Sequence, residues 1–235
     1  MSHKPEAAVT GRRGLARQAV GNMAWVAWGS ATVSLLRVLV LVILTRLLAP
    51  ADFGLVSAAL VVIDAQQEYF APLGKVVLPQ GPAAAEKIAG ALAWARTQRV
   101  PVIHIVHESR KPNPATFAPG SPTLEIHPLA TPAGDEPVLV KHLPGSFTGT
   151  ALEEILRRQR IERLILSGFM TQMCVDTTAR QAAHLGFKVT VLSDATAAMD
   201  VKAPDGAVIP AADVHRTHLG SLNGFLAEVK RSTEL

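Results

Sequence analysis

Short aliphatic runs alternate with longer amphipathic segments from residue 58 to the end of the chain. Continuous runs such as residues 60–63 are typical of strands that are buried on both faces of a parallel sheet. Residues 83–99 instead repeat apolar side chains with helical spacing, at Ile88, Leu92 and Ala95. The pattern predicts strands over 60–63, 100–106, 138–140, 164–166 and 188–193, and helices over 83–99, 150–160, from 171 onward and 210–229. Such alternation predicts an α/β fold, a doubly wound and mostly parallel sheet with helices on both faces.

The first 57 residues follow a different pattern. Residues 1–19 are polar and basic, and residues 23–48 are strongly apolar. The apolar stretch exceeds the roughly 20 residues that cross a bilayer, although Arg37 interrupts it and a secretory signal fits less well. We therefore expect two parts: a basic segment with an apolar helix over 1–57, and a domain over 58–235. Residues 20–48 are a candidate for membrane association.

Charge and cysteine content exclude some functions. The net charge of +4 owes much to the basic N-terminal segment. The sequence has no basic stripe with interleaved aromatic residues of the kind that binds nucleic acid. The sequence has no internal repeat and no glycine-rich phosphate loop. A single cysteine, Cys174, cannot form an internal disulfide, and a free thiol suits a reducing compartment.

Three chemically useful residues each follow a predicted strand. Asp64 ends the run 60–63, Lys141 follows 138–140, and Cys174 lies in the first helical turn after 164–166, where Ser167 and Gly168 are expected to end the strand. Backbone N–H groups at a helix start favour a thiolate. Carboxyl ends of parallel strands share one edge of the sheet. A base, a positively charged orienting group and a nucleophile could therefore meet there. Each also has a plain structural alternative: a helix-capping Asp64, a surface Lys141 and an inert, buried Cys174.

The surrounding motifs resemble the isochorismatase-like cysteine hydrolase superfamily, which includes nicotinamidases and N-carbamoylsarcosine amidohydrolases. The matching stretches run over residues 62–66, 141–147, 167–175 and 192–197, within a resemblance covering about 58–230. The resemblance implies an Asp64, Lys141 and Cys174 triad. It also implies a cis peptide just before Met170, with the Met170 and Cys174 N–H groups forming an oxyanion hole.

The nucleophilic cysteine separates reaction classes within that superfamily. Members that cleave the enol ether of isochorismate usually lack it, so Cys174 favours hydrolysis of a C–N bond in a small amide, lactam or carbamoyl compound through a thioester. Metal-binding nicotinamidases carry an Asp-x-His pair after the second strand, whereas this chain has His104 and His107, which a regular strand points to opposite sides. We expect no metal and no cofactor.

A substrate pocket is expected around the three strand ends. The candidate lining residues are Gln66, Phe70, His107, Phe117, His127, Phe147 and Phe169. The proline-rich stretch 111–135 is expected to form an ordered lid. We expect His104 to be a hydrogen-bonded core residue, and Asp194 to brace the sheet edge without a catalytic role.

Residues 13–60 resemble the start of polysaccharide or lipid-linked oligosaccharide flippases, through the stretches 21–25 and 44–56. Two alternatives to a hydrolase therefore stay open: a catalytically silent binding module of the same fold, and a membrane-transport-related fragment fused to a hydrolase domain. We expect a cytoplasmic catalytic domain, membrane-associated if residues 20–48 insert. On the resemblance alone, we also expect a homo-oligomer.

Overall fold

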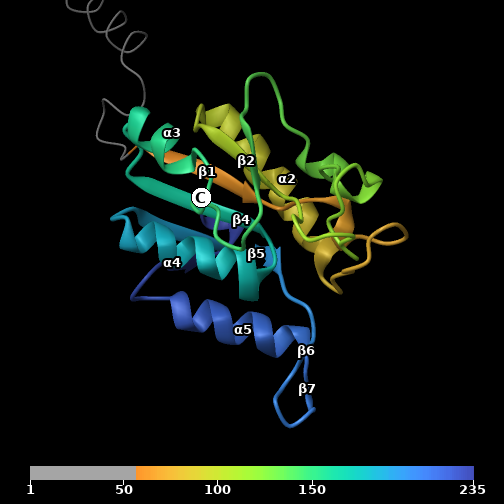
Figure 1. The fold of residues 1–235 in the computed structure, drawn as a ribbon. Helices are drawn as coiled ribbons and strands as arrows, with labels where there is room; N and C mark the ends of the chain where they lie inside the picture. The colour runs from red at the N-terminus through yellow and green to blue at the C-terminus, as the bar shows by residue number, and fades with distance from the viewer. Residues whose placement is uncertain (1–56) are drawn as a thin grey trace, which may run out of the picture. The chain divides into compact units, whose positions relative to one another are not determined.

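The computed structural model describes residues 57–235, and these form a six-stranded parallel sheet flanked by helices (Figure 1). The strand order is β3-β2-β1-β4-β5-β8, and every neighbouring pair in it is parallel. The strands are β1 (Ala58–Ile63), β2 (Val102–His107), β3 (Val138–Lys141), β4 (Arg163–Phe169), β5 (Lys188–Ala197) and β8 (Glu228–Lys230). The predicted parallel sheet with helices is confirmed.

Helices cover both faces of this sheet, and each face has its own apolar core. Helix α2 (Gly81–Gln98) packs on the face that carries Leu60, Val62 and Ile165. The opposite face carries Ala59, Val61 and others, and is covered by α3 (Leu152–Arg158), α4 (Asp176–His184) and α5 (Ala211–Leu222). Alternate residues of one strand thus enter different cores, which explains the continuous aliphatic runs in the sequence.

The C-terminal region differs from the expected closing helix over 210–229. Helix α5 ends at Leu222, and Gly224 adopts a φ of +86°, which turns the chain away from the helix. Residues Glu228–Lys230 then pair with β5 as the edge strand β8. A two-stranded antiparallel hairpin, β6 (Val201–Lys202) and β7 (Val208–Ile209), was also not predicted.

Strand β4 continues beyond its predicted end to Phe169, and Gly168 makes this possible. Gly168 has a φ of +112°, and a Cβ atom there would lie 1.9 Å from the carbonyl oxygen of Ile63. No other residue could accept that distance without moving the β1 backbone. The glycine therefore brings the carboxyl ends of β1 and β4 together, at the edge where Asp64 and Cys174 lie.

The N-terminal predictions lie outside the described residues. These are the apolar helix over 20–48 and nearly all of the flippase-like stretch 13–60. Within residues 57–235, no helix combines the length and the apolar character needed to cross a membrane.

Candidate active site

Asp64, Lys141 and Cys174 meet at the carboxyl edge of the sheet. Asp64 directly follows β1, with a φ of +49° that turns its backbone at the strand end. Lys141 is the last residue of β3, two strands away, and its long side chain reaches across the end of β2. Cys174 lies in the turn of π-helix Thr171–Val175 that connects β4 to α4. The topology alone therefore brings together three residues that are far apart in the sequence.

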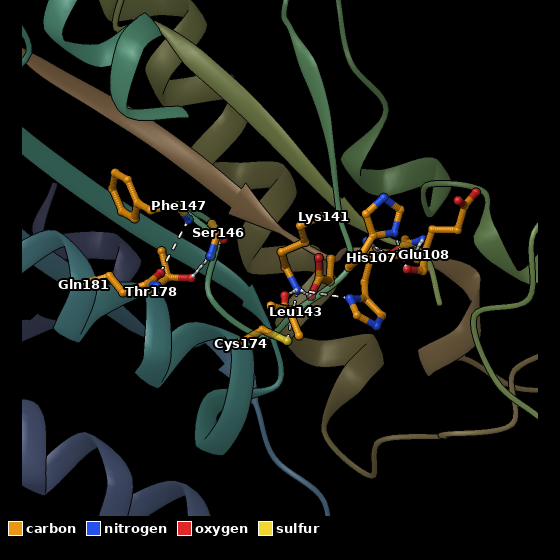
Figure 2. A network of polar contacts seen from close by, with 12 residues as sticks. His107, Glu108, Lys141, Leu143, Ser146, Phe147, Cys174, Thr178 and Gln181 are labelled. Atoms are coloured by element: carbon orange, nitrogen blue, oxygen red, sulfur yellow. Dashed lines mark hydrogen bonds and ion pairs between the residues drawn. The ribbon is translucent and has the colours of Figure 1, made fainter. Parts of the chain in front are cut away.

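The Lys141 ammonium is the centre of this cluster (Figure 2). Its Nζ lies 2.8 Å from Asp64 Oδ2. The same atom lies 3.3 Å from Cys174 Sγ. It also donates to the carbonyl oxygen of Leu143 at 3.1 Å. The side chains of Asp64 and Lys141 are fully buried. A buried charge of either sign is costly unless it is paired, so the two form an ion pair shielded from water.

Burial and the neighbouring charges shift the pKa values of all three residues. Burial raises the pKa of Cys174, and the Asp64 carboxylate raises it further, although the Lys141 ammonium opposes both. Burial also raises the pKa of Asp64, with Lys141 acting against it. Burial lowers the pKa of Lys141, but the charges of Asp64 and Cys174 outweigh this and leave it raised. The expectation that the helix start favours a thiolate stays a prediction, with burial acting against it and Lys141 in its favour.

The backbone around Cys174 has an unusual course. The Phe169–Met170 peptide is cis, as the resemblance implied. The N–H groups of Met173 and Val175 both donate to the Met170 carbonyl oxygen, at 3.1 and 3.2 Å. From α5, His215 Nδ1 lies 2.9 Å from the Thr171 hydroxyl. These contacts hold the turn that carries the sulfur atom between two helices.

The predicted pocket residues fall into separate groups, and His107 and Phe117 lie beside the triad. His107 Nδ1 is 3.4 Å from Lys141 Nζ, and the Phe117 ring meets the imidazole edge to face at 4.9 Å. Gln66 is also close, but its buried side chain is fully engaged with the backbone. It donates to the carbonyl oxygens of His107 and Leu124 and accepts from the His107 N–H. Gln66 therefore fixes the end of β2 and does not present a free polar group.

Phe70 and His127 line a cavity of about 400 Å³, and their rings lie 4.0 Å apart. None of the three triad residues lines this cavity. Phe169 is fully buried and packs against Phe70, with ring centroids 5.7 Å apart. The structure thus places Phe169 in the core, next to the cavity that Phe70 and His127 share.

Phe147 lies apart from the triad (Figure 2). Its ring stacks on Phe187 at 5.9 Å, next to the amino end of β5. The preceding loop is held on α4, because the Ser146 N–H donates to the Thr178 hydroxyl and the Phe147 N–H donates to Gln181. These bonds direct the ring away from the carboxyl edge, so Phe147 does not belong to the pocket.

Two buried neighbours of the site were not predicted, Glu68 and Tyr69. Glu68 is fully buried and accepts hydrogen bonds from the Phe117 N–H and the Thr123 hydroxyl, which ties the stretch 111–135 to the end of β1. Tyr69 is buried against Phe117, and burial together with the charge of Asp64 raises its pKa. For Glu68, the available signal in the sequence was an acidic residue among apolar residues that are buried in the fold.

The structural roles predicted for two other polar residues are confirmed. His104 is buried in the core, with Nε2 2.9 Å from a Glu136 oxygen. Asp194 accepts from the N–H and the hydroxyl of Ser232, at 2.7 and 3.0 Å, and so braces the chain after β8. Within residues 57–235 no group of three or more metal-ligating side chains comes together. Metal independence stays a prediction.

Comparisons with known proteins identify the family. The isochorismatase domain matches residues 58–229. The uncharacterized isochorismatase family protein YddQ of Bacillus subtilis is 36% identical over 174 residues, which cover 74% of this chain and 96% of the relative. Maleamate amidohydrolase of Pseudomonas putida is 32% identical over 152 residues, covering 58% of this chain and 70% of that enzyme.

Solved structures agree. The crystal structure of a cysteine hydrolase from Pseudomonas syringae pv. phaseolicola superposes with a TM-score of 0.71 at 28% identity, covering 76% of this chain and 90% of that one. This chain belongs to the isochorismatase family and is a hydrolase of that family.

Proposed function

We propose that this protein hydrolyses a C–N bond of a small amide, lactam or carbamoyl compound, with Cys174 as the nucleophile. One observation carries the proposal: a single buried ammonium, Lys141 Nζ, lies 2.8 Å from a carboxylate and 3.3 Å from a thiol. A lysine with a purely structural role needs only one carboxylate partner. A nucleophile needs a base and a counter-charge close to it, and Asp64 and Lys141 are placed to supply these to Cys174.

In the first half-reaction the Cys174 thiol gives its proton to Asp64 as the sulfur attacks the carbonyl carbon. A C–S bond forms and the carbonyl π electrons move onto oxygen. The Met170 and Cys174 N–H groups are our candidates to hold this oxyanion, and one such donor can contribute about 3 kcal/mol. When the intermediate collapses, the C–N bond breaks, Asp64 returns its proton to the departing nitrogen, and a thioester remains on Cys174.

In the second half-reaction water releases the acid. Asp64, ionised again, takes a proton from the water as its oxygen attacks the thioester carbon. The new tetrahedral intermediate expels the sulfur, and the proton on Asp64 restores the thiol. Protons and charges balance over the cycle, and the products are a carboxylic acid and an amine or ammonia.

Lys141 has a constant role in this scheme. Its raised pKa keeps it an ammonium, because the nearby negative charges outweigh its burial. It first balances Asp64, and then balances the sulfur as negative charge passes to it. This explains how a thiol with a raised pKa can still act as a nucleophile: the proton leaves during attack and no free thiolate has to accumulate.

The comparisons support the reaction class. Maleamate amidohydrolase is by its name an enzyme that acts on an amide, and it is 32% identical over 152 residues. The alternative, a silent binding module of the same fold, would not need Asp64, Lys141 and Cys174 in mutual contact.

Ammonia release tests the proposal. Purified protein is incubated with a panel of primary amides and carbamoyl compounds, and lactam opening is followed separately by mass spectrometry. Cys174→Ala and the near-isosteric Cys174→Ser serve as matched controls, with circular dichroism to verify folding. We expect turnover by the wild type and loss of at least about a thousandfold in both variants. Turnover that survives either substitution would contradict the nucleophile, and a folded wild type inactive on the whole panel would favour the binding module.

A further inference from the structure

His107 is a neighbour of the triad that the proposed mechanism does not use. It ends β2 and stands opposite Lys141 in the register of β2 and β3. Its Nδ1 lies 3.4 Å from Lys141 Nζ (Figure 2). The backbone of His107 is held on both sides by Gln66, and its ring by Phe117. An imidazole fixed so firmly beside a reactive centre has a defined orientation toward whatever binds there.

The contact with Lys141 determines where the imidazole carries its proton. An ammonium group has three N–H donors and no acceptor. A proton on His107 Nδ1 would face this positively charged group at 3.4 Å, so the contact favours an unprotonated Nδ1. The single proton of the neutral ring then lies on Nε2. The pKa of His107 supports this state: burial lowers it to about 4, with further lowering by the charges of Lys141 and His142.

Nε2 is available for a ligand. Within residues 57–235 it has no hydrogen-bond partner. It is not a fully buried atom, and His107 as a whole is partly exposed. The neighbouring donors are already engaged, since Gln66 binds the backbone and Lys141 is shared among Asp64, Leu143 and Cys174. The imidazole N–H is thus a fixed, uncharged donor on the residue next to Lys141, which itself contacts Cys174.

We propose that His107 is a specificity-determining residue whose Nε2–H binds a second acceptor oxygen of the substrate. This rests on the proposed function and narrows its substrate class. The substrate is a small amide that carries another carbonyl or carboxylate oxygen, close enough to reach His107 while its amide carbon faces Cys174. A donor at this position disfavours a cationic or donor group there, because two donors would meet.

The tautomer is tested first. Protein labelled with 15N-histidine gives separate Nδ1 and Nε2 signals, and His107→Gln assigns those of His107. We expect an unprotonated Nδ1 and a protonated Nε2 at pH 7. A protonated Nδ1 at that pH would overturn the proposal.

The ligand is tested with matched amides that differ only in the second oxygen. Oxamate, malonamate, succinamate and maleamate are each compared with the alkyl or alkenyl amide of the same length, using folded Cys174→Ala protein so that nothing is consumed. We expect at least one of the four acids to shift the His107 Nε2 signal saturably, and to bind about three- to tenfold more weakly after His107→Leu, as loss of one hydrogen bond implies. His107→Gln, which keeps an N–H near that position, should recover part of the affinity.

Each result has a separate meaning. If no acid shifts Nε2, or if the matched amides bind equally well, His107 does not select an acceptor oxygen and the inference fails. If Nε2 responds while the wild-type protein releases no ammonia from the same compounds, the binding site stands and the proposed hydrolysis fails for this class of amide.

Discussion

The Cys174 thiol is buried beside a carboxylate, and this decides how its chemistry can proceed. A cysteine that stayed ionised would need a lowered pKa, but burial and Asp64 raise it. The contact with Lys141 at 3.3 Å offsets part of that cost. Deprotonation is therefore expected to accompany attack on a bound substrate.

The same residues give a pH prediction. Asp64 must be ionised to accept the thiol proton, and its pKa is raised above the ordinary value of 3.8 because burial outweighs the pull of Lys141. Lowering the pH protonates Asp64, so kcat/KM should fall on the acid side at a pH above 3.8. The measurement is a pH profile of kcat/KM on a substrate with no titrating group in that range. A profile that stays flat down to the ordinary aspartate range would contradict the role of Asp64.

Gly168 supports the site through the backbone alone, and alanine there should be severely destabilising. The new Cβ would lie 1.9 Å from the Ile63 carbonyl oxygen, at a φ of +112°. Strain and displacement of β1 together should cost at least about 3 kcal/mol of unfolding free energy, or prevent folding. Gly186→Ala is the matched control, since its φ is +85° but its Cβ would meet nothing within 4 Å. It should cost about 1–2 kcal/mol. Equal losses in urea unfolding would show that the contact with β1 is unimportant.

At the scale of elements, Glu136 connects helix α2 to strand β2. It pairs with Arg96 at 2.8 Å and with His104 at 2.9 Å. Burial alone would raise its pKa, but the hydrogen bond from Arg96, with those from Ala133 and His104, lowers it from 4.5 to about 2. A lowered carboxyl pKa stabilises the fold above the unfolded value, and this contribution is lost as the pH falls through the folded one.

Wild-type protein should therefore lose more unfolding free energy than Glu136→Gln between pH 4.5 and about 2. Urea unfolding at several pH values measures this difference. Glu86→Gln is the control, because Glu86 is an exposed carboxylate on helix α2. Its pH curve should follow that of the wild type. Parallel pH curves for wild type and Glu136→Gln would show that this connection between α2 and β2 contributes nothing.

The hydrophobic pattern predicted the strands that are buried on both faces of the sheet, because such strands are continuous aliphatic runs, as in residues 60–63. It missed β8, since Glu228–Lys230 is a short edge strand whose pairing comes from β5 and not from its own pattern. Asp64, Lys141 and Cys174 could be predicted to share an edge because strand ends are visible in the sequence. The direction of Phe147 could not, because it depends on bonds from Ser146 and Phe147 to α4, which are distant in the chain.

At the scale of the molecule, the candidate site depends on the whole sheet. Asp64 follows β1, Lys141 ends β3 and Cys174 follows β4, while helices on both faces hold these strands in register. The described part of the chain, residues 57–235, therefore contains every residue that the proposed chemistry requires. Family membership accounts for the fold and the hydrolase class, and the geometry at the edge is what suggests the cysteine mechanism.

The thioester on Cys174 is the central claim, and rapid-quench mass spectrometry tests it most directly. Wild-type protein is mixed with an amide that it turns over, quenched in acid within milliseconds and analysed as intact protein and as peptides. We expect a transient mass increase equal to the substrate minus its amine, located on the peptide that contains Cys174 and absent in Cys174→Ala. Turnover without any adduct on Cys174, for an amide whose acylation step is faster than hydrolysis of the thioester, would contradict the covalent mechanism.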